Sequence, residues 1–332
     1  MNTNVTILSL SFGAFLSLLC SCATQPNGIV TAPLRPELPA EQIICDKAGE
    51  PLVVNLRLAD GQDVPFMVDT GTSITTLDRS LERCLGPCLG TKRLNKPLSG
   101  VGSETVSVYP APKLYLGNVP LITGPTILAG NITRATNHAY NAILGMDCLG
   151  HYCIQMDFAA GKMRFLDPGS LEREGLGRAY SIAEVEGAPV VNMSLPDDKS
   201  LRLMMDTGFY QFADGTLPPG LIRPAFQNRT AFGTPVFLTF TQDTANQIFL
   251  FPTMVIGGQT YKDLRFLELL VKGSRVQGFI GLRFMARHVV TFDFPKREVY
   301  LRLINEGQPE TEVERIDPAE ASQHGPAEAN PT

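Results

Sequence analysis

The chain has no tryptophan among its 332 residues, only four histidines, and a low share of charged residues, 18%. Its net charge of -5 argues against nucleic acid as the main partner, because nucleic acid selects basic surfaces. Neither a His-Glu-x-x-His nor a Gly-x-Ser-x-Gly motif occurs, so the usual signals of a zinc protease and a serine hydrolase are missing. The histidines, at positions 138, 151, 288 and 324, are therefore interpreted as surface or structural residues.

Long apolar stretches with helical periodicity are scarce after residue 50, whereas glycine (30) and proline (25) are plentiful. This balance predicts strands joined by turns, that is, an all-β fold. With 44% hydrophobic residues the chain can bury a sizeable core, and its length suits about two domains.

Residues 1–22 have the pattern of an export signal. The apolar run at residues 5–19 is shorter than the roughly 20 residues that cross a bilayer, and it ends in small residues. It closes with the sequence LCSC, which resembles the bacterial lipobox, so we expect Cys22 to carry a lipid; ordinary cleavage near Ala23 is the alternative. Both outcomes predict an exported protein of the cell envelope, and the lipid would anchor a lipoprotein to the membrane facing the periplasm.

Two further segments are predicted to lack a core of their own. Residues 23–44 are rich in Pro, Gln, Asn and Ala and are expected to form a linker. Residues 305–332 are acidic, rich in Pro and Ala and poor in apolar residues, so we expect a disordered tail.

The most informative stretch, residues 66–73, returns as a near-copy at residues 203–210. Each copy runs an apolar strand into an Asp-Thr-Gly turn, at Asp69 and at Asp206. A carboxylate at the end of a buried strand is costly unless it is hydrogen-bonded or functional. Two of them in equivalent positions suggest a pair that meets across a two-fold axis.

Other landmarks repeat in the same order. A Leu-Val-Val-Asn segment ends at Asn55, before Asp69, and a Pro-Val-Val-Asn segment ends at Asn192, before Asp206, with the same spacing in both copies. Each half later contains Ile-Leu-Gly or Phe-Ile-Gly followed by Asp-Phe, again at equal spacing. An internal duplication explains this best and divides the chain into residues 45–170 and 171–304.

These residues resemble the pepsin and retropepsin group of aspartic proteases. Asp69, Thr70, Gly71, Thr72 and Ser73 match the first family signature, and the elements ending at positions 145 and 281 match the segments beneath the catalytic loops. The spacing between each Asp and that Gly, from 69 to 145 and from 206 to 281, is similar to two fused retropepsin-like units. The resemblance implies two β-barrel lobes related by pseudo-two-fold symmetry, with an active-site cleft between them.

By the same resemblance, Asp69 and Asp206 form the catalytic dyad. Two carboxylates about 3 Å apart share one proton, so one acts as general base on a water while the other donates to the scissile carbonyl. The dyad-supporting residues implied are Thr70, Gly71, Thr72, Thr207 and Gly208.

The function expected is therefore that of an aspartic endopeptidase that hydrolyses peptide or protein substrates. It would need no metal and no cofactor, and a fused pair would work as a monomer. The rival hypothesis is an inactive protease-like envelope lipoprotein that binds peptide or another ligand in the cleft; a structural β-protein is a third.

One residue departs from the family pattern. The family usually has Ser or Thr after the Gly, as at Thr72, but the second copy has Phe209. Loss of a donor to the ionised carboxylate should raise the pKa of Asp206. The consequence is either an active enzyme with a pH profile shifted toward neutral or a distorted, non-catalytic second loop.

Export also suggests a reading of the cysteines. The spacings predict local disulfides between Cys84 and Cys88 and between Cys148 and Cys153, with one four-thiolate zinc site as the competing interpretation. Cys45 has no predicted partner.

A glycine-rich turn at residues 98–103, followed by a short strand that includes Tyr109, is consistent with a flap over the substrate or with an ordinary β-turn.

Overall fold

Strands dominate the computed structural model of the chain, which describes residues 37–44, 50–94, 104–135, 140–194, 200–210, 213–222, 236–239, 247–269 and 275–304. These residues form two large sheets and only short helices, which confirms the all-β prediction. The predictions for the export signal, Cys22, Cys45, the turn at residues 98–103, His138, His324 and the acidic tail lie outside the described residues.

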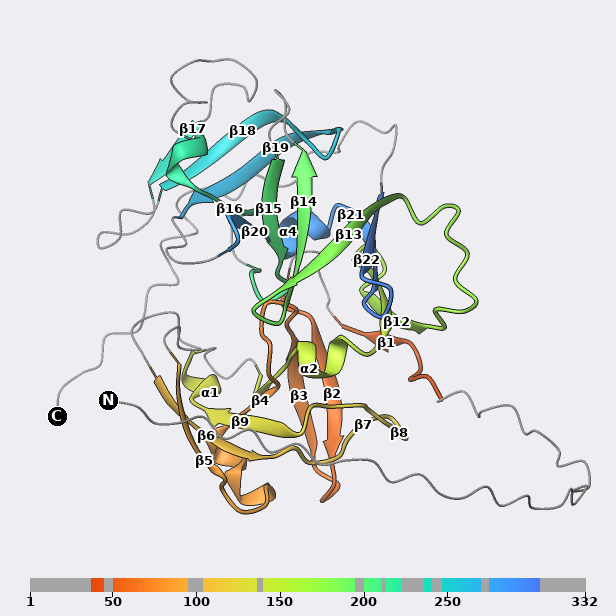
Figure 1. Cartoon of the computed structure of the whole chain (residues 1–332), viewed down its shortest axis with the longest axis vertical. Coiled ribbons are helices and arrows are strands. Elements are labelled where there is room, and N and C mark those ends of the chain that lie inside the picture. The colour runs from red at the N-terminus through yellow and green to blue at the C-terminus, as the bar shows by residue number, and fades with distance from the viewer. Residues whose placement is uncertain are drawn as a thin grey trace, which may run out of the picture. The chain divides into compact units, whose positions relative to one another are not determined.

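The first sheet has nine strands in the order β5-β6-β9-β4-β10-β3-β2-β7-β8 and comes from the first half of the chain (Figure 1). The strands are β2 (Val53–Leu58), β3 (Asp63–Val68), β4 (Thr76–Asp78), β5 (Gly90–Leu94), β6 (Glu104–Pro110), β7 (Leu114–Leu116), β8 (Val119–Pro120), β9 (Thr126–Gly130) and β10 (Ala142–Leu144).

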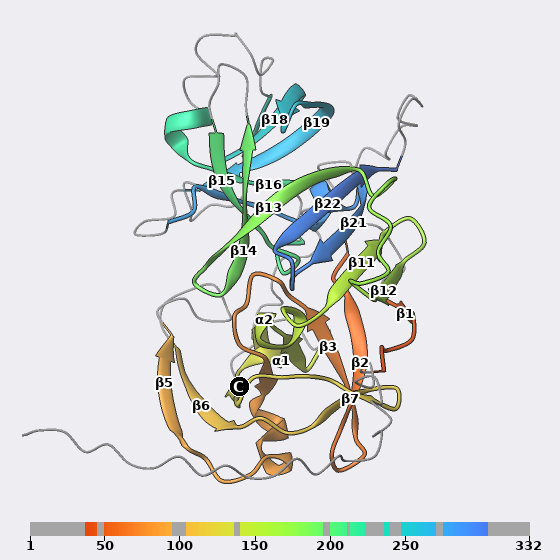
Figure 2. The same ribbon diagram turned by 45° about the vertical axis from the view of Figure 1, so that its right-hand side comes forward.

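The second sheet has thirteen strands in the order β1-β12-β11-β21-β22-β13-β14-β15-β20-β16-β19-β18-β17. Figure 2 shows its part from β13 through β22, β21, β11 and β12 to β1 as neighbouring ribbons. The strands are β1 (Gln42–Ile43), β11 (Cys153–Asp157), β12 (Lys162–Leu166), β13 (Arg178–Val185), β14 (Ala188–Ser194), β15 (Ser200–Met205), β16 (Gly215–Leu217), β17 (Val236–Thr239), β18 (Gln247–Ile256), β19 (Gln259–Glu268), β20 (Gly278–Ile280), β21 (His288–Asp293) and β22 (Glu298–Leu303).

Both sheets have two open ends. The first ends at β5 and β8, and the second at β1 and β17. The expectation of β-barrel lobes is therefore wrong for the described strands, because no pairing joins the end strands and closes either sheet.

The helices are short: η1 (Arg79–Cys84, a 3-10 helix), α1 (Ile132–Ala135), α2 (Met146–Leu149) and α4 (Leu282–Met285). Buried side chains from both sheets pack in one hydrophobic cluster, with Phe66 and Leu144 from the first sheet and Leu203 and Phe292 from the second. This shared core holds the ends of the central strands in place.

Two parallel strand pairs position the Asp-Thr-Gly turns. β10 runs parallel to β3 with Leu144 opposite Val68, and β20 runs parallel to β15 with Ile280 opposite Met205. A parallel pair places the C-terminal ends of both strands at the same edge. Each Asp-Thr-Gly turn therefore starts beside the glycine that precedes α2 or α4.

The two halves of the chain also meet in the second sheet, where β11 pairs antiparallel with β21. At the centre of this pair Gln155 lies opposite Thr291, and its Nε2 donates to Thr291 Oγ1 at 3.1 Å. On either side of the centre, Cys153 lies opposite Asp293 and Asp157 lies opposite Val289.

Candidate active site

Asp69 follows the last residue of β3, where the chain leaves the sheet. Its N–H donates to the carbonyl of Leu144 at 3.0 Å and so extends the pairing with β10. Asp206 takes the same place after β15, with its N–H on the carbonyl of Ile280 at 2.9 Å. The sequence predicts this placement, because each apolar strand is buried and the first polar residue after it must sit at the strand end.

The carboxyl group of Asp69 accepts hydrogen bonds from its own turn. The N–H of Gly71 donates to Oδ1 at 2.8 Å and the Thr72 hydroxyl donates to Oδ2 at 2.6 Å. Asp206 accepts from the N–H of Gly208 at 2.9 Å on Oδ1 and from the N–H of Phe209. The two turns thus supply similar backbone donors, but only the first supplies a hydroxyl.

The structure brings the two carboxyl groups together, and they are hydrogen-bonded to each other. Each one also lies against the glycine of the opposite turn. A Cβ at Gly208 would lie 2.5 Å from Asp69 Cγ, and a Cβ at Gly71 would collide with Asp206 Oδ1. Glycine is required at both positions because any side chain would push the carboxyl groups apart.

The threonines of the two turns form a reciprocal set of hydrogen bonds. The N–H of Thr70 donates to Thr207 Oγ1 at 2.9 Å, and the N–H of Thr207 donates to Thr70 Oγ1 at 3.0 Å. Each hydroxyl in turn donates to a strand-end carbonyl, Thr70 to Met205 at 2.6 Å and Thr207 to Val68 at 2.8 Å. Both threonines are fully buried, so this network fixes the turns relative to each other.

The surroundings of the two carboxyl groups shift their pKa values to different extents. Burial raises the pKa of both. The pKa of Asp206 is raised well above its usual range, first by burial and then by the charge of Asp69, whereas the Thr72 hydroxyl and Gly71 N–H oppose the rise at Asp69. These hydrogen bonds favour the ionised form of Asp69 more than that of Asp206.

Phe209 leaves the backbone of the second turn like that of the first. Its N–H donates to the carbonyl of Asp206 at 3.2 Å, and its carbonyl accepts from Leu282 at 2.8 Å. Thr72 makes the equivalent bonds to Asp69 at 3.4 Å and from Met146 at 2.8 Å. The Phe209 ring packs against Gly281, at whose position a Cβ would collide with Cδ1 of the ring. Phe209 therefore offers no hydroxyl donor, yet its turn keeps the backbone hydrogen bonds of the first turn.

Two tyrosines beside the dyad were not singled out from the sequence. Tyr140 is buried and hydrogen-bonded to Tyr210, and its pKa is raised by burial, by Tyr210 and by the charge of Asp69. Tyr210 follows the second turn but packs against the apolar cluster around Met67 and Tyr140 of the first half. The only sequence signal was the position of Tyr210 directly after the second turn.

A buried ionic group supports the second turn from below. Asp214 is fully buried, accepts from the N–H of Arg265 at 2.7 Å, and lies 3.4 Å from Arg287 Nε and 3.7 Å from Arg283 Nε. Its carbonyl accepts from the N–H of Gly281 at 2.9 Å. Burial raises the pKa of Asp214 while the two guanidinium groups oppose the rise. Through Gly281, Asp214 holds the end of β20 beside the second Asp-Thr-Gly turn.

The two predicted disulfides are not formed, which corrects the sequence analysis. Cys84, Cys88, Cys148 and Cys153 are free thiols. The Cys84 sulfur faces Gln62 Oε1 at 3.7 Å, and the Cys88 sulfur donates to the carbonyl of Gly90 at 3.3 Å, so close spacing in sequence does not make them partners. Burial raises the pKa of Cys148, and raises that of Cys153 to about 12, which keeps both thiols protonated.

Other predicted features are placed as follows. Tyr109, considered as a flap residue, is buried in β6 within the core. His151 is exposed, while His288 is buried and hydrogen-bonded, which agrees with surface and structural roles. Within the described ranges, no group of three or more His, Cys, Asp or Glu side chains is arranged to hold a metal ion.

Among the helices of the described residues, none has the length and apolar character needed to span a membrane. A scan against protein families finds no match to this chain, and a search of curated proteins finds no similar sequence.

Proposed function

We propose that the chain is an aspartic endopeptidase in which Asp69 is the general base and Asp206 the general acid. The ionised Asp69 takes a proton from a water whose oxygen bonds to the peptide carbonyl carbon, while Asp206 gives its proton to the carbonyl oxygen. When the resulting gem-diol collapses, the C–N bond breaks, Asp69 gives its proton to the amine, and a gem-diol hydroxyl returns a proton to Asp206. Water is the only other reactant.

One observation carries this proposal: two carboxyl groups from distant segments of the chain, Asp69 and Asp206, are hydrogen-bonded to each other. Bringing two acids together raises the pKa of one of them and is unfavourable for folding, so a purely structural role has no reason to require it. Asp206 is only partly buried, which leaves a path for solvent to the pair.

The proposal includes two pseudo-two-fold-related lobes with the dyad between them, as in the pepsin and retropepsin group. The pairing of β11 with β21 supports this symmetry. Positions 136 residues apart correspond in the two copies, so Gln155 corresponds to its own partner, Thr291. By the same offset Cys153 corresponds to Val289 and Asp157 to Asp293, so each of the two flanking pairs corresponds to the other. The reciprocal hydrogen bonds of Thr70 and Thr207 support a two-fold axis at the dyad.

We further propose that the enzyme works as an exported lipoprotein, anchored through Cys22 and facing the periplasm. The lipobox-like sequence at residues 19–22 supports the anchor. In this setting a monomer acts on peptides or proteins of the envelope.

A non-catalytic ligand-binding protein is the second candidate, because Phe209 deprives Asp206 of the hydroxyl donor that Thr72 gives to Asp69. The undistorted backbone of the Phe209 turn favours the peptidase.

The deciding experiment is cleavage of a quenched fluorescent peptide library by the full-length protein from pH 3 to 8. Asp69→Asn and Asp206→Asn should each abolish cleavage, and pepstatin should inhibit the wild type. Asp63→Asn is the matched control because Asp63 is exposed at the start of β3, the strand that Asp69 follows. A folded protein that cleaves nothing over the whole range, or whose activity survives both dyad substitutions, would refute the peptidase.

A further inference from the structure

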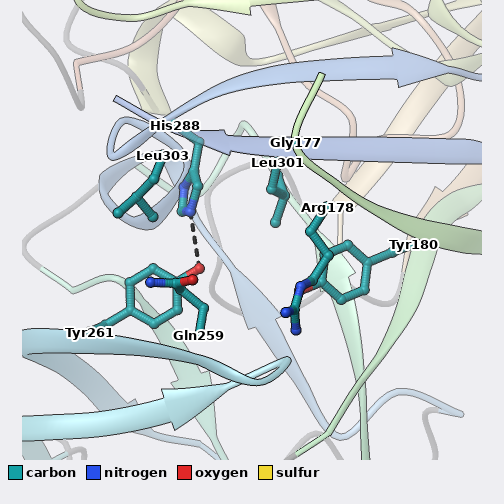
Figure 3. A pocket seen from close by; sticks show the side chains of 8 residues that line it. All are labelled: Gly177, Arg178, Tyr180, Gln259, Tyr261, His288, Leu301 and Leu303. Carbon is teal, nitrogen blue, oxygen red and sulfur yellow. Dashed lines mark hydrogen bonds between the residues drawn. The ribbon is translucent and has the colours of Figure 1, made fainter. Parts of the chain in front are cut away.

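A cavity of about 330 Å³ opens among the strands of the second sheet. It shares no residue with the dyad or its supporting turns. Figure 3 shows Arg178 and Tyr180 on one side of it and Gln259, Tyr261 and His288 on the other. Its volume is at the lower end of the range for small-molecule sites, enough for a ligand of amino-acid size.

At one wall of the cavity, the hydrogen bonds of His288 determine which way the Tyr261 hydroxyl donates its hydrogen. His288 Nδ1 lies 3.1 Å from the carbonyl of Phe284, which can only accept, so Nδ1 carries the hydrogen. Burial lowers the pKa of His288 to about 4, so the ring is neutral and Nε2 is an acceptor. The Tyr261 hydroxyl, 3.0 Å away, therefore donates to Nε2, and its remaining lone pairs can accept from a ligand.

The opposite wall presents a cation and a free hydroxyl. Arg178 is exposed and forms no ion pair within the described ranges, and the Tyr180 hydroxyl has no hydrogen-bond partner there. The turn between β18 and β19 holds both side chains. A Cβ at Gly258 would lie 2.6 Å from Arg178 Nη1, and one at Gly257 would collide with the Tyr180 oxygen.

The lining of the cavity includes one cationic side chain, Arg178, and no acidic one. The charged groups that act on the Tyr261 hydroxyl are Arg178 and Arg287, and both oppose the rise of its pKa that burial causes. Arg287 also acts on His288. Arg287 is itself paired with Asp214, so Arg178 is the cation of the cavity lining that can pair with an anion.

The remaining wall is aliphatic. Leu301 and Leu303 line the cavity from alternate positions of β22, which places both side chains on one face of the strand. Arg302 lies between them in sequence, is exposed, and is absent from the lining.

We propose that this cavity binds the α-carboxylate, neighbouring N–H and aliphatic side chain of a leucine-like residue. The carboxylate pairs with Arg178 and accepts from the Tyr180 hydroxyl, the N–H donates to the Tyr261 oxygen, and the side chain packs on Leu301 and Leu303. A free amino acid and the C-terminus of a peptide both carry this chemistry. The site is independent of the proposed peptidase.

The test is isothermal titration calorimetry of the full-length protein with L-leucine and with N-acetyl-L-leucine, which stands for a peptide C-terminus. Saturable binding of at least one is expected, and the tighter of the two identifies the source. Arg178→Gln should weaken binding about tenfold or more, because it removes a charge-assisted hydrogen bond. L-leucinamide, which lacks the carboxylate, should be weaker by a similar factor.

Arg302→Gln is the matched control, because it removes an exposed arginine from the neighbouring position outside the cavity, and it should bind like the wild type. Arg178→Gln should also keep the circular dichroism spectrum and any peptide cleavage of the wild type. No saturable binding of either probe, or equal binding by Arg178→Gln, would overturn the proposal whatever the outcome at the dyad.

Discussion

Thr70 and Thr207 exchange hydrogen bonds in both directions, each N–H donating to the other's hydroxyl at 2.9 and 3.0 Å. Each hydroxyl then donates onward to the carbonyl at the end of the opposite strand, so each hydroxyl both accepts and donates a hydrogen bond. The two turns are thereby joined by four buried hydrogen bonds, two from N–H donors and two from hydroxyl donors. Rigid placement of the carboxyl groups depends on this network.

Thr207→Val should destabilise the protein by roughly 2 to 4 kcal/mol, because it leaves the Thr70 N–H without its acceptor and the Val68 carbonyl without its donor in a buried site. Urea unfolding of the full-length protein measures this. Thr207→Ser keeps the hydroxyl and should cost about 1 kcal/mol, the value of a buried methyl group. Equal losses for Val and Ser would show that the hydroxyl contributes little.

Gly208→Ala should lower the free energy of unfolding by about 1 to 3 kcal/mol, the usual cost of forcing an extra carbon into a packed site. The new Cβ would lie 2.5 Å from Asp69 Cγ, and its displacement would separate the two carboxyl groups. Gly220→Ala is the matched control, because a Cβ there has nothing within 4 Å. Unfolding curves should separate the two variants, and the peptide-library assay should show loss of cleavage in the first alone. Indistinguishable curves would contradict the close approach.

The sequence predicted that Asp69 and Asp206 follow buried strands, because each Asp-Thr-Gly turn comes directly after an apolar run. The repeated landmarks also anticipated that positions near Gly145 and Gly281 lie beside the two turns, which the parallel pairings explain. The conformation of such a motif depends mainly on residues close to it in sequence, and the internal repeat presents each motif twice.

Contacts between distant segments were beyond the sequence. Tyr140 and Tyr210 lie far apart in the chain and carry no shared motif, so their hydrogen bond emerges only from the fold. The cysteines show the opposite error: Cys84 and Cys88 are close in sequence, but their sulfurs face different oxygens. Sequence spacing limits which cysteines can form a disulfide, whereas the directions of their side chains decide whether the sulfurs meet.

Phe209→Thr should move the alkaline limb of any peptidase activity to lower pH. A hydroxyl at this position can donate to the ionised Asp206, as Thr72 does to Asp69 at 2.6 Å, and a donor to the charged form lowers a pKa. Because the active dyad must keep one proton, a lower pKa of Asp206 ends activity at lower pH. Phe209→Val is the control, since valine has the shape of threonine without the hydroxyl. Identical pH profiles for Thr and Val would exclude the hydrogen bond as the cause.

Asp206→Asn should stabilise the protein relative to the wild type, and the stabilisation should be larger at pH 7 than at pH 4. The folded-state pKa of Asp206 is raised well above 3.8, the value of an unperturbed Asp side chain. A carboxyl group of this kind favours the folded state most below pH 3.8, and that contribution is lost as the pH rises through the folded-state pKa. Asparagine is neutral throughout, keeps an oxygen for the Gly208 N–H and can donate to Asp69, so it does not incur this loss.

Urea unfolding at both pH values measures the difference without any requirement for catalysis. Asp63→Asn, which alters an exposed carboxylate at the start of β3, should stay within about 0.5 kcal/mol of the wild type at pH 7. An Asp206→Asn variant less stable than the wild type by the same amount at pH 4 and pH 7 would mean that the folded protein imposes no electrostatic penalty on Asp206. In that case the proton would not be confined to Asp206, and the assignment of acid and base to the two carboxyl groups would fail even if the peptidase were active.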